Sequence, residues 1–428
     1  MRRQILRAGA ILIAGLGLGL AGAQAAPKGE ITVWSWNIAA EALDMLVPDF
    51  NKKYPDVKVN VLNMGNGDVY TKTLAGCAAG GTDLPDVVTI ENSEAEIQWA
   101  RFPDCFVNLK EFGVEKYVDK FPAFKWTELM AGDGIFSLPW DSGPTMIFYR
   151  RDLYEKAGVD PAAINTWDDF INAGKKILAA TNGEVKMVTI DMNEDGWFRA
   201  LANQESCSYF TNDGEAVAIN QPGCVVALEM IKKMIDAGIV ANGDWGGQIQ
   251  NIKTNSVASA YFGGWYEGTI RSNAPEQSGK WGMYPPPAVE PGGVRAANWG
   301  GSSLAITSSS KNKEAAWAYI EYALATDEGQ ISMLRNRGLV PSLLSAVSTD
   351  YAKSPMEYWG GQPVWTDMLA TQGNIPPYRG TQYFDEVRGT IVNKTISDFM
   401  NGNYKTAKEA LDFAASQIVS ATGVPIAQ

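Results

Sequence analysis

Side chains that could hold a polar ligand recur along the chain as short groups in which an indole stands next to a polar residue or a glycine. These groups are Trp36-Asn37, Trp140-Asp141, Gly263-Gly264-Trp265 and Trp299-Gly300-Gly301, and the pair Glu91-Asn92 adds a carboxylate and an amide. An indole face packs against C–H surface, whereas carboxylates and amides form hydrogen bonds with hydroxyl groups. The set predicts non-covalent capture of a flat, hydroxyl-rich molecule such as a sugar.

Each group also has an ordinary structural interpretation. Trp34 and Trp36 share one face of an extended segment, so both could be core residues. Glu91 could be the N-terminal acid or cap of a helix that starts near Ser93. Trp140 could instead pack at the hinge, and Trp265 could pack in the core at the end of a strand. Gly300-Gly301 could simply form a tight turn that needs glycine.

Trp197 and Trp245 lie in polar segments that contain glycine and are further candidates for ligand contact. The segment before Trp197, Asp191–Gly196, fits the first half of a calcium loop. Its twelfth position is Ala202, where such a loop requires a bidentate glutamate. We therefore expect an Asp/Asn-rich turn here and no metal site.

Covalent chemistry has little support. The chain has no histidine, which excludes Ser-His-Asp and Cys-His catalysis and histidine-ligated zinc. A secreted glycosidase or polysaccharide lyase remains an alternative, because two carboxylates suffice for glycoside hydrolysis and the chain has 48 acidic residues. No local motif marks such a pair, so we expect a binding protein that is not an enzyme and needs no cofactor.

Alternating helices and apolar strands must position these groups. The pattern predicts strands at 31–33, 57–62 and 87–90, a helix over 39–53, and a helix capped by Asp68 that reaches about Ala79. This alternation is typical of α/β folds with parallel strands. Ligands of such sheets bind beyond the carboxyl ends of the strands, where Trp36-Asn37 and Glu91-Asn92 follow their strands.

Length and charge limit the class of protein and of partner. A chain of 428 residues is long enough for two domains, and 46% hydrophobic with 20% charged residues is an ordinary globular composition. The formal net charge is −12. This negative charge argues against nucleic acid and anionic membrane surfaces as partners.

Residues 1–25 have the composition of a secretory signal peptide, which predicts a periplasmic protein. Arg2, Arg3 and Arg7 precede an apolar run, 8–20, and Ala23-Gln24-Ala25 offers a cleavage site. The run is shorter than the roughly 20 residues that span a bilayer. General and twin-arginine export both remain open, and the absence of a cysteine after the cleavage site argues against a lipid anchor.

All four cysteines, Cys77, Cys105, Cys207 and Cys224, follow the predicted cleavage site. An even number in an oxidising compartment favours two disulfides. Three pairings are possible, and the one between sequence neighbours joins Cys77 to Cys105 and Cys207 to Cys224.

The segment 136–177, FSLPWDSGPTMIFYRRDLYEKAGVDPAAINTWDDFINAGKKI, resembles the middle of the extracellular solute-binding proteins of ATP-driven sugar importers, the family that includes maltose-binding proteins. The similarity continues through GGSSLAI and SKNKEAAWAYIEYAL (300–324), GLVP (338–341) and the C-terminal FMNGNYKTAKEAL (399–411). It therefore covers most of the chain.

This resemblance implies a two-lobe α/β fold in which mostly parallel sheets flanked by helices are joined by hinge crossings. The first lobe would comprise residues 26–140 and 300–345, and the second 141–299 and 346–428. The resemblance also makes Asp141 an acidic sugar contact and Trp265 a stacking residue. It places a late aromatic contact in the segments Pro377-Tyr378-Arg379 and Gln382-Tyr383-Phe384.

The function that the resemblance implies is capture of a mono- or oligosaccharide by a monomer that delivers it to the permease subunits of an ABC importer. A polyol or a glycerophosphate-type ester is the alternative ligand. A phosphate ligand would need arginines in the cleft, and Arg379 is the one that the sequence places near it.

Overall fold

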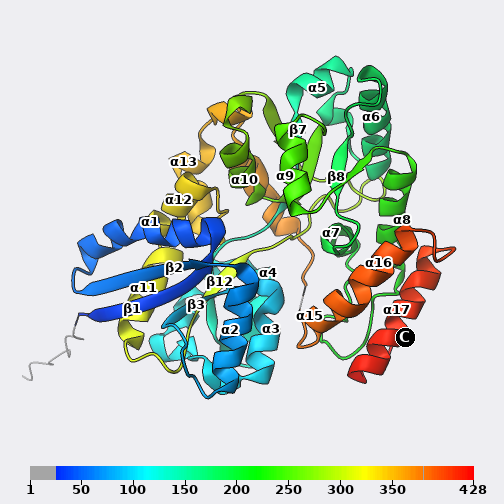
Figure 1. Ribbon diagram of the computed structural model, residues 1–428. Coiled ribbons are helices and arrows are strands. Elements are labelled where there is room, and N and C mark those ends of the chain that lie inside the picture. The colour runs from blue at the N-terminus through cyan, green and yellow to red at the C-terminus, as the bar shows by residue number, and fades with distance from the viewer. Residues whose placement is uncertain (1–25, 379) are drawn as a thin grey trace, which may run out of the picture.

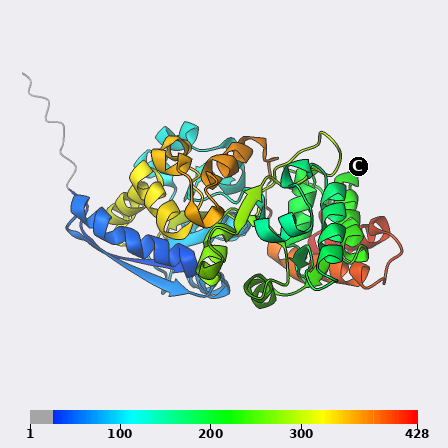
Figure 2. The same ribbon diagram turned by 90° about the horizontal axis from the view of Figure 1, so that it is seen from above.

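The computed structural model describes residues 26–378 and 380–428, so the predicted signal peptide and Arg379 lie outside the described residues. Two lobes lie side by side (Figures 1 and 2), and the chain passes between them more than once. In the described part of the chain, no helix combines the length and apolar character that crossing a membrane requires.

The first lobe is built on a five-stranded sheet with the strand order β2-β1-β3-β12-β6. Its elements are β1 (Gly29–Trp36), α1 (Asn37–Lys53), β2 (Val57–Met64), α2 (Asn66–Ala78), β3 (Val87–Glu91), α3 (Asn92–Arg101), α4 (Ala123–Leu129), β4 (Met130–Ala131), β5 (Gly134–Ile135), β6 (Ser137–Pro139), β12 (Ser302–Ile306), α11 (Lys313–Leu324) and α12 (Asp327–Arg337). Strands β1, β2 and β3 are parallel, as expected, and β12 runs antiparallel between β3 and β6.

Apolar side chains on both faces of this sheet explain why helices cover both. Val33 and Leu304 pack in one cluster with residues of α1 and α11. Val88 and Ile90, two residues apart on β3, pack on the opposite face with Trp99 of α3. The predicted apolar strand at 87–90 is confirmed as β3, buried on both faces.

The second lobe has an antiparallel sheet, β10-β7-β11, and a parallel pair, β8-β9. Its elements are β7 (Thr145–Arg150), α5 (Arg151–Lys156), α6 (Trp167–Ala180), β8 (Val188–Ile190), α7 (Gly196–Gln204), α8 (Pro222–Asp236), β9 (Val240–Asn242), α9 (Trp245–Lys253), β10 (Ser259–Gly263), α10 (Tyr266–Asn273), β11 (Trp281–Tyr284), α15 (Phe384–Val387), the π-helical turn η9 (Arg388–Val392), α16 (Asn393–Met400) and α17 (Ala407–Thr422). The antiparallel sheet departs from the mostly parallel arrangement expected of this lobe, because β7 is flanked on both sides by strands that run the other way.

Helices α13 (Asp350–Lys353) and α14 (Val364–Thr371) lie where the lobes meet. Trp359 and Trp365 pack in one cluster with Trp281 of the second lobe and Met333 of the first. This cluster therefore continues from one lobe to the other.

The crossings between the lobes lie side by side and are joined by backbone hydrogen bonds. Trp140 N donates to Ser302 O at 3.0 Å, Trp299 N to Gly143 O at 2.7 Å, and Ser142 N to Val340 O at 2.9 Å. A Cβ atom at Gly143 would lie 2.1 Å from the carbonyl oxygen of Trp299. Glycine is therefore required where the first two crossings touch.

Two local expectations need correction. Asp68 does not cap α2, which begins at Asn66 after Gly65, so Asp68 lies in the first turn instead. Its carboxylate can still interact favourably with the positive end of the helix. The helix predicted over 39–53 begins two residues earlier and continues through Pro48 to Lys53.

Candidate functional site

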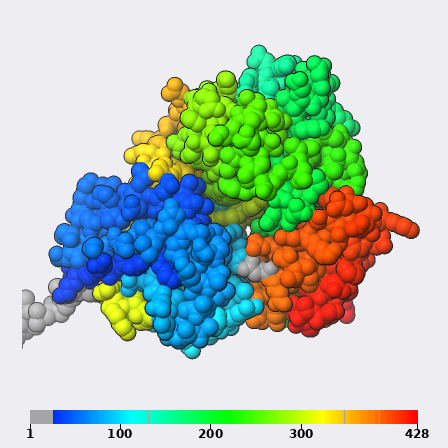
Figure 3. All heavy atoms as spheres, in the orientation of Figure 1, coloured from blue at the N-terminus to red at the C-terminus, as the bar shows by residue number. Residues whose placement is uncertain are grey.

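A pocket of about 480 Å³, here called the central pocket, lies where the two lobes and their crossings meet. Figure 3 shows the surfaces of the lobes in contact, with a narrow opening where they meet the C-terminal segment. The predicted site residues that line the central pocket are Trp36, Asn37, Glu91, Asp141, Trp245, Trp265, Trp299, Gly300 and Gly301. Residues from six separate segments therefore meet at one place.

Trp36 and Asn37 reach the pocket because β1 ends and α1 begins between them. Asn37 has φ +36°, a left-handed conformation that asparagine tolerates better than most residues. Trp36 is 7% exposed and meets Tyr70 edge to face at 5.5 Å. Trp36 is therefore a core residue, as the alternative interpretation predicted, and it also lines the pocket.

Glu91 follows β3 and occupies the N-cap position of α3, yet its side chain makes no capping hydrogen bond. Its oxygens instead accept from the hydroxyl of Tyr70 at 3.2 Å and from that of Ser93 at 3.1 Å. The carboxylate is thereby held by two hydroxyls at the pocket wall.

Asp141 is 5% exposed and lies at the start of the first crossing. Ser302 N donates to its Oδ1 at 2.8 Å, and Lys125 Nζ donates to its backbone oxygen at 2.7 Å. Burial raises the pKa of the Asp141 carboxyl to about 6, although Lys125 and the bond from Ser302 act in the opposite direction. This carboxyl therefore titrates close to neutral pH.

Trp265 and Trp299 form the aromatic wall of the central pocket. The indole Nε1 of Trp265 donates to Trp299 O at 2.8 Å, which fixes the orientation of its ring. Phe262 packs against both, with ring centroids 5.8 Å from Trp265 and 4.8 Å from Trp299. Both indoles are only partly buried, so part of their surface faces the pocket.

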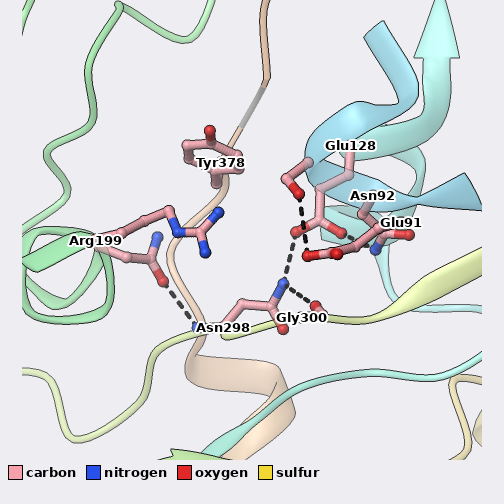
Figure 4. Close-up of a pocket in the computed structure, with 9 residues that line it drawn as sticks. Glu91, Asn92, Glu128, Arg199, Asn298, Gly300 and Tyr378 are labelled. Carbon is pink, nitrogen blue, oxygen red and sulfur yellow. Dashed lines mark hydrogen bonds between the residues drawn. The ribbon is translucent and has the colours of Figure 1, made fainter. Parts of the chain in front are cut away.

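A smaller polar pocket adjoins the central pocket at Glu91 and Gly300 and is lined also by Asn92, Ser93, Glu128, Arg199, Asn203, Asn298 and Tyr378. Figure 4 shows Arg199 and Tyr378 on the opposite side of this pocket from the Glu91 and Glu128 carboxylates. Asn298, from the second crossing, donates to Glu128 Oε1 at 2.9 Å, and Asn92 donates to Oε2.

Charges in the polar pocket modify one another. Burial raises the pKa of Glu128 to about 7 despite Lys125, whose Nζ lies 3.9 Å from Glu128 Oε2. Burial also lowers the pKa of Lys125, although neighbouring acids favour its charged form. Burial acts to lower the pKa of the Arg199 guanidinium, but the attraction of Asp195, which lies 3.6 Å away, together with that of other neighbouring acidic groups raises it. The polar pocket therefore offers hydrogen-bond acceptors from one lobe and a cation from the other.

A third pocket of about 400 Å³, here called the side pocket, shares Trp245, Trp265 and Trp299 with the central pocket. Trp197 lines it and is 3% exposed. Asp191 also lines it, and its Oδ1 accepts from Asn193 N at 2.9 Å, a local bond typical of an Asx turn.

Two predicted site residues that the structure describes, Trp140 and Tyr383, do not line the pockets described above. Trp140 is fully buried in the core cluster, because consecutive residues of an extended segment point in opposite directions and Asp141 faces the pocket. Tyr383 packs near Phe210 in the core of the second lobe. Arg379 lies outside the described residues, whereas Tyr378 lines the polar pocket.

Several residues of the site were not predicted from the sequence, chiefly Glu128, Arg199, Asn203 and Asn298. Asn298 directly precedes Trp299-Gly300-Gly301, so the glycine-rich segment was a usable signal for it. Glu128 lies three residues after Lys125 on α4, a spacing typical of an exposed ion pair. Tertiary packing against the crossings buries both, and no local pattern shows that.

The two disulfides are Cys77–Cys105 in the first lobe and Cys207–Cys224 in the second, the pairing between sequence neighbours. Cys105 lies in the turn after α3, and Cys207 follows α7. Each bond therefore joins segments of one lobe and leaves the crossings between the lobes unlinked.

The sequence and the fold are both similar to those of known binding proteins. The family model for bacterial extracellular solute-binding proteins matches residues 35–330. A lactose-binding protein of Rhizobium radiobacter is 32% identical over 92% of this chain and 94% of its own length. An arabinooligosaccharide-binding protein of Bacillus subtilis is 27% identical over 91% of this chain and 92% of its own length.

Solved structures of binding proteins also have a similar fold. A transporter-associated binding protein from B. animalis subsp. lactis, in complex with β-1,6-galactobiose, superposes with a TM-score of 0.78 at 26% identity. That match covers 92% of this chain and 97% of the other. The sugar-binding protein MalE of Xanthomonas citri has the same fold, with a TM-score of 0.76 at 20% identity over 92% of this chain and 97% of the other.

Proposed function

Because this chain belongs to the bacterial extracellular solute-binding protein family, we propose that it is the substrate-binding component of an ABC carbohydrate importer. One observation carries the proposal. The central pocket brings the carboxylates of Glu91 and Asp141 together with the partly exposed indoles of Trp265 and Trp299 between the two lobes. This pairing suits a ring that has apolar faces and a hydroxyl edge.

The mechanism is capture without chemistry. A ligand in the central pocket contacts Glu91 of the first lobe and Trp265 of the second. It therefore favours the closed form, in which both contacts are made. The ligand shifts the equilibrium between open and closed forms only by its preference for the closed form. The permease subunits of the importer then recognise the closed, loaded form.

The two lobes that move relative to each other are those expected from the sequence. The first comprises residues 26–140 and 300–345, and the second comprises residues 141–299 and 346–428. Movement is expected at the crossings, because they are the segments that pass from one lobe to the other. The protein acts as a monomer in the periplasm, a location that the predicted signal peptide and the two disulfides support.

A neutral sugar is the best-supported ligand. Glu91, Glu128 and Asp141 line the central and polar pockets, whereas Arg199 is the cation that lines them among the described residues. This excess of acids opposes a phosphate or carboxylate ligand, which weakens the glycerophosphate alternative. The names of the relatives suggest galactosides and arabino-oligosaccharides as the first candidates.

The test is a thermal-shift screen of the purified mature protein, followed by calorimetry with every compound that raises the melting temperature. The panel should contain lactose, β-1,6-galactobiose, arabinobiose, maltose, sorbitol and glycerol 3-phosphate. A ligand at 100 times its dissociation constant adds about 2.7 kcal/mol to the free energy of unfolding, so its effect is easily measured.

A shift with a sugar that is recovered unchanged supports the proposal. A shift with sorbitol or glycerol 3-phosphate alone would replace the carbohydrate with one of these ligands. Release of new reducing ends from a polysaccharide would instead identify an enzyme.

A further inference from the structure

The side pocket is large enough to hold a further sugar unit next to the ligand of the central pocket. Its volume of about 400 Å³ is close to the 480 Å³ of the central pocket, and Trp245, Trp265 and Trp299 line both. Each volume lies within the range of roughly 300–1,000 Å³ that small-molecule sites occupy. The two pockets are therefore adjoining spaces along one aromatic wall.

We propose, on the basis of the proposed function, that the ligand is an oligosaccharide whose chain continues from the central pocket into the side pocket. Trp245 and Gln248 of α9 determine the preferred length. The sugar units in the two pockets contact opposite parts of the shared tryptophan wall.

Trp245 is placed to contact a sugar ring. It is 48% exposed, although Trp265 and Tyr266 hold it with ring centroids 6.0 and 5.8 Å away. Asp244 caps the helix that Trp245 begins, since its Oδ1 accepts from Gly247 N at 2.9 Å. The indole is thus positioned by its neighbours while nearly half of its surface stays available for stacking.

The side pocket has a polar lining beside its aromatic wall. Gln248 lies one turn after Trp245, lines the side pocket and is 8% exposed. Its side-chain amide therefore lies at the pocket wall, next to the exposed indole of Trp245. Amide groups form hydrogen bonds with hydroxyl groups, so this wall suits a sugar unit.

The charges of the side pocket also suit a neutral chain. Its lining has four carboxylates and two guanidinium groups, namely Asp191, Glu194, Asp195, Asp244, Arg199 and Arg388. Asp195 is paired with Arg199 at 3.6 Å, and its Oδ2 accepts from the Tyr209 hydroxyl. The remaining excess of acid disfavours uronic acids and phosphorylated sugars.

The test compares ligands that differ by one sugar unit. Calorimetry on the mature protein would use β-1,6-galactobiose against β-1,6-galactotriose, and arabinobiose against arabinotriose. We expect the trisaccharide of the recognised series to bind at least tenfold more tightly than its disaccharide. Gln248→Ala, which alters a residue of the side pocket only, should reduce this ratio below threefold and leave the affinity for the disaccharide unchanged. Trp245→Ala should reduce the same ratio.

Two further variants separate the pockets. Trp265→Ala should weaken binding of both lengths, and Phe413→Ala should change neither, because Phe413 is 48% exposed on α17 and lines none of the pockets described. Equal affinities for both lengths in the wild-type protein would overturn the inference and leave the proposed function standing. An unchanged ratio in both Gln248→Ala and Trp245→Ala would also overturn it. If no sugar of these series or of the thermal-shift panel binds, the proposed function fails first.

Discussion

The side-chain amide of Asn298 donates a 2.9 Å hydrogen bond to Oε1 of Glu128, and this contact joins the second crossing to helix α4 of the first lobe. The Oδ1 atom of Asn298 accepts from Gly143 N at 3.1 Å, and its backbone N–H donates to Asn203 Oδ1 at 3.0 Å. One asparagine thus contacts the other crossing and helix α7 of the second lobe as well. The polar pocket is therefore built on contacts that join both lobes to the two crossings.

Replacing Asn298 by alanine should destabilise the protein by about 2–3 kcal/mol, because Glu128 is 4% exposed and loses one of its hydrogen-bond donors. Urea unfolding measures the change. The matched control is Asn403→Ala, since Asn403 makes an exposed side-chain bond to Asp398 and should contribute less than about 0.5 kcal/mol. Equal stability of the two variants would show that the Glu128 network contributes nothing to the hinge.

Replacing Trp265 by alanine should weaken binding of the recognised sugar at least tenfold, or about 1.4 kcal/mol, without unfolding the protein. The physical reason is loss of a stacking face whose orientation is fixed by the bond to Trp299 O. Calorimetry gives the affinity, and circular dichroism checks the fold. Phe413→Ala serves as the control for loss of an exposed aromatic ring. Unchanged affinity in Trp265→Ala would remove this residue from the site.

The site residues that could be predicted from the sequence are those at the carboxyl end of a strand or directly after it. Trp36, Asn37 and Glu91 line the central pocket because β1 and β3 are parallel neighbours whose carboxyl ends lie at one edge. Their positions could be predicted because the strands are apolar and short, and the polar residues that follow them stand out.

The parts that were missed depend on contacts between distant segments. Trp140 and Asp141 were predicted together, yet backbone alternation sends the first into the core and the second to the pocket. Arg199 lies in the middle of α7 and faces Glu128 across the lobes, about 70 residues away in sequence. No periodicity within one helix indicates such a partner.

Replacing Gly301 by alanine should cost about 1–2 kcal/mol more than the same change at Gly292. Both glycines have positive φ, +104° and +82°. A Cβ atom at Gly301 would lie 2.9 Å from Asp141 O and 3.0 Å from Lys125 Nζ, whereas one at Gly292 meets nothing within 4 Å. The comparison in urea unfolding separates crowding at the crossing from backbone strain alone. Equal losses would show that the crossing accommodates the methyl group.

Replacing both cysteines of either disulfide by alanine should lower the free energy of unfolding by about 3–4 kcal/mol. The bonded cysteines are 28 and 17 residues apart, so each bond restricts a loop of moderate length in the unfolded chain. Sugar affinity should stay within twofold, because none of the four cysteines lines the pockets described. Unfolding and calorimetry on the same two variants test both statements. A large loss of affinity with little loss of stability would contradict this division of roles.

Sugar affinity should fall as the pH is lowered from 8 to 5. Burial raises the pKa of Glu128 to about 7 and that of Asp141 to about 6, so both carboxyls take up a proton in this interval. Hydroxyl groups donate more strongly to an ionised carboxylate than to a protonated carboxyl, so binding should release protons near pH 6 to 7. Calorimetry in two buffers of different ionisation enthalpy measures this release.

The stability contributed by the same two groups should change in the opposite direction. A carboxyl whose pKa is raised in the folded protein binds its proton more tightly there than in the unfolded chain. Its contribution to the free energy of unfolding therefore increases as the pH falls from 8 toward 5, while the affinity decreases. Asp141→Asn, which keeps an oxygen for Ser302 N, should remove the part of both profiles near pH 6. An affinity that is constant from pH 5 to 9 would mean that neither carboxylate accepts a hydrogen bond from the ligand.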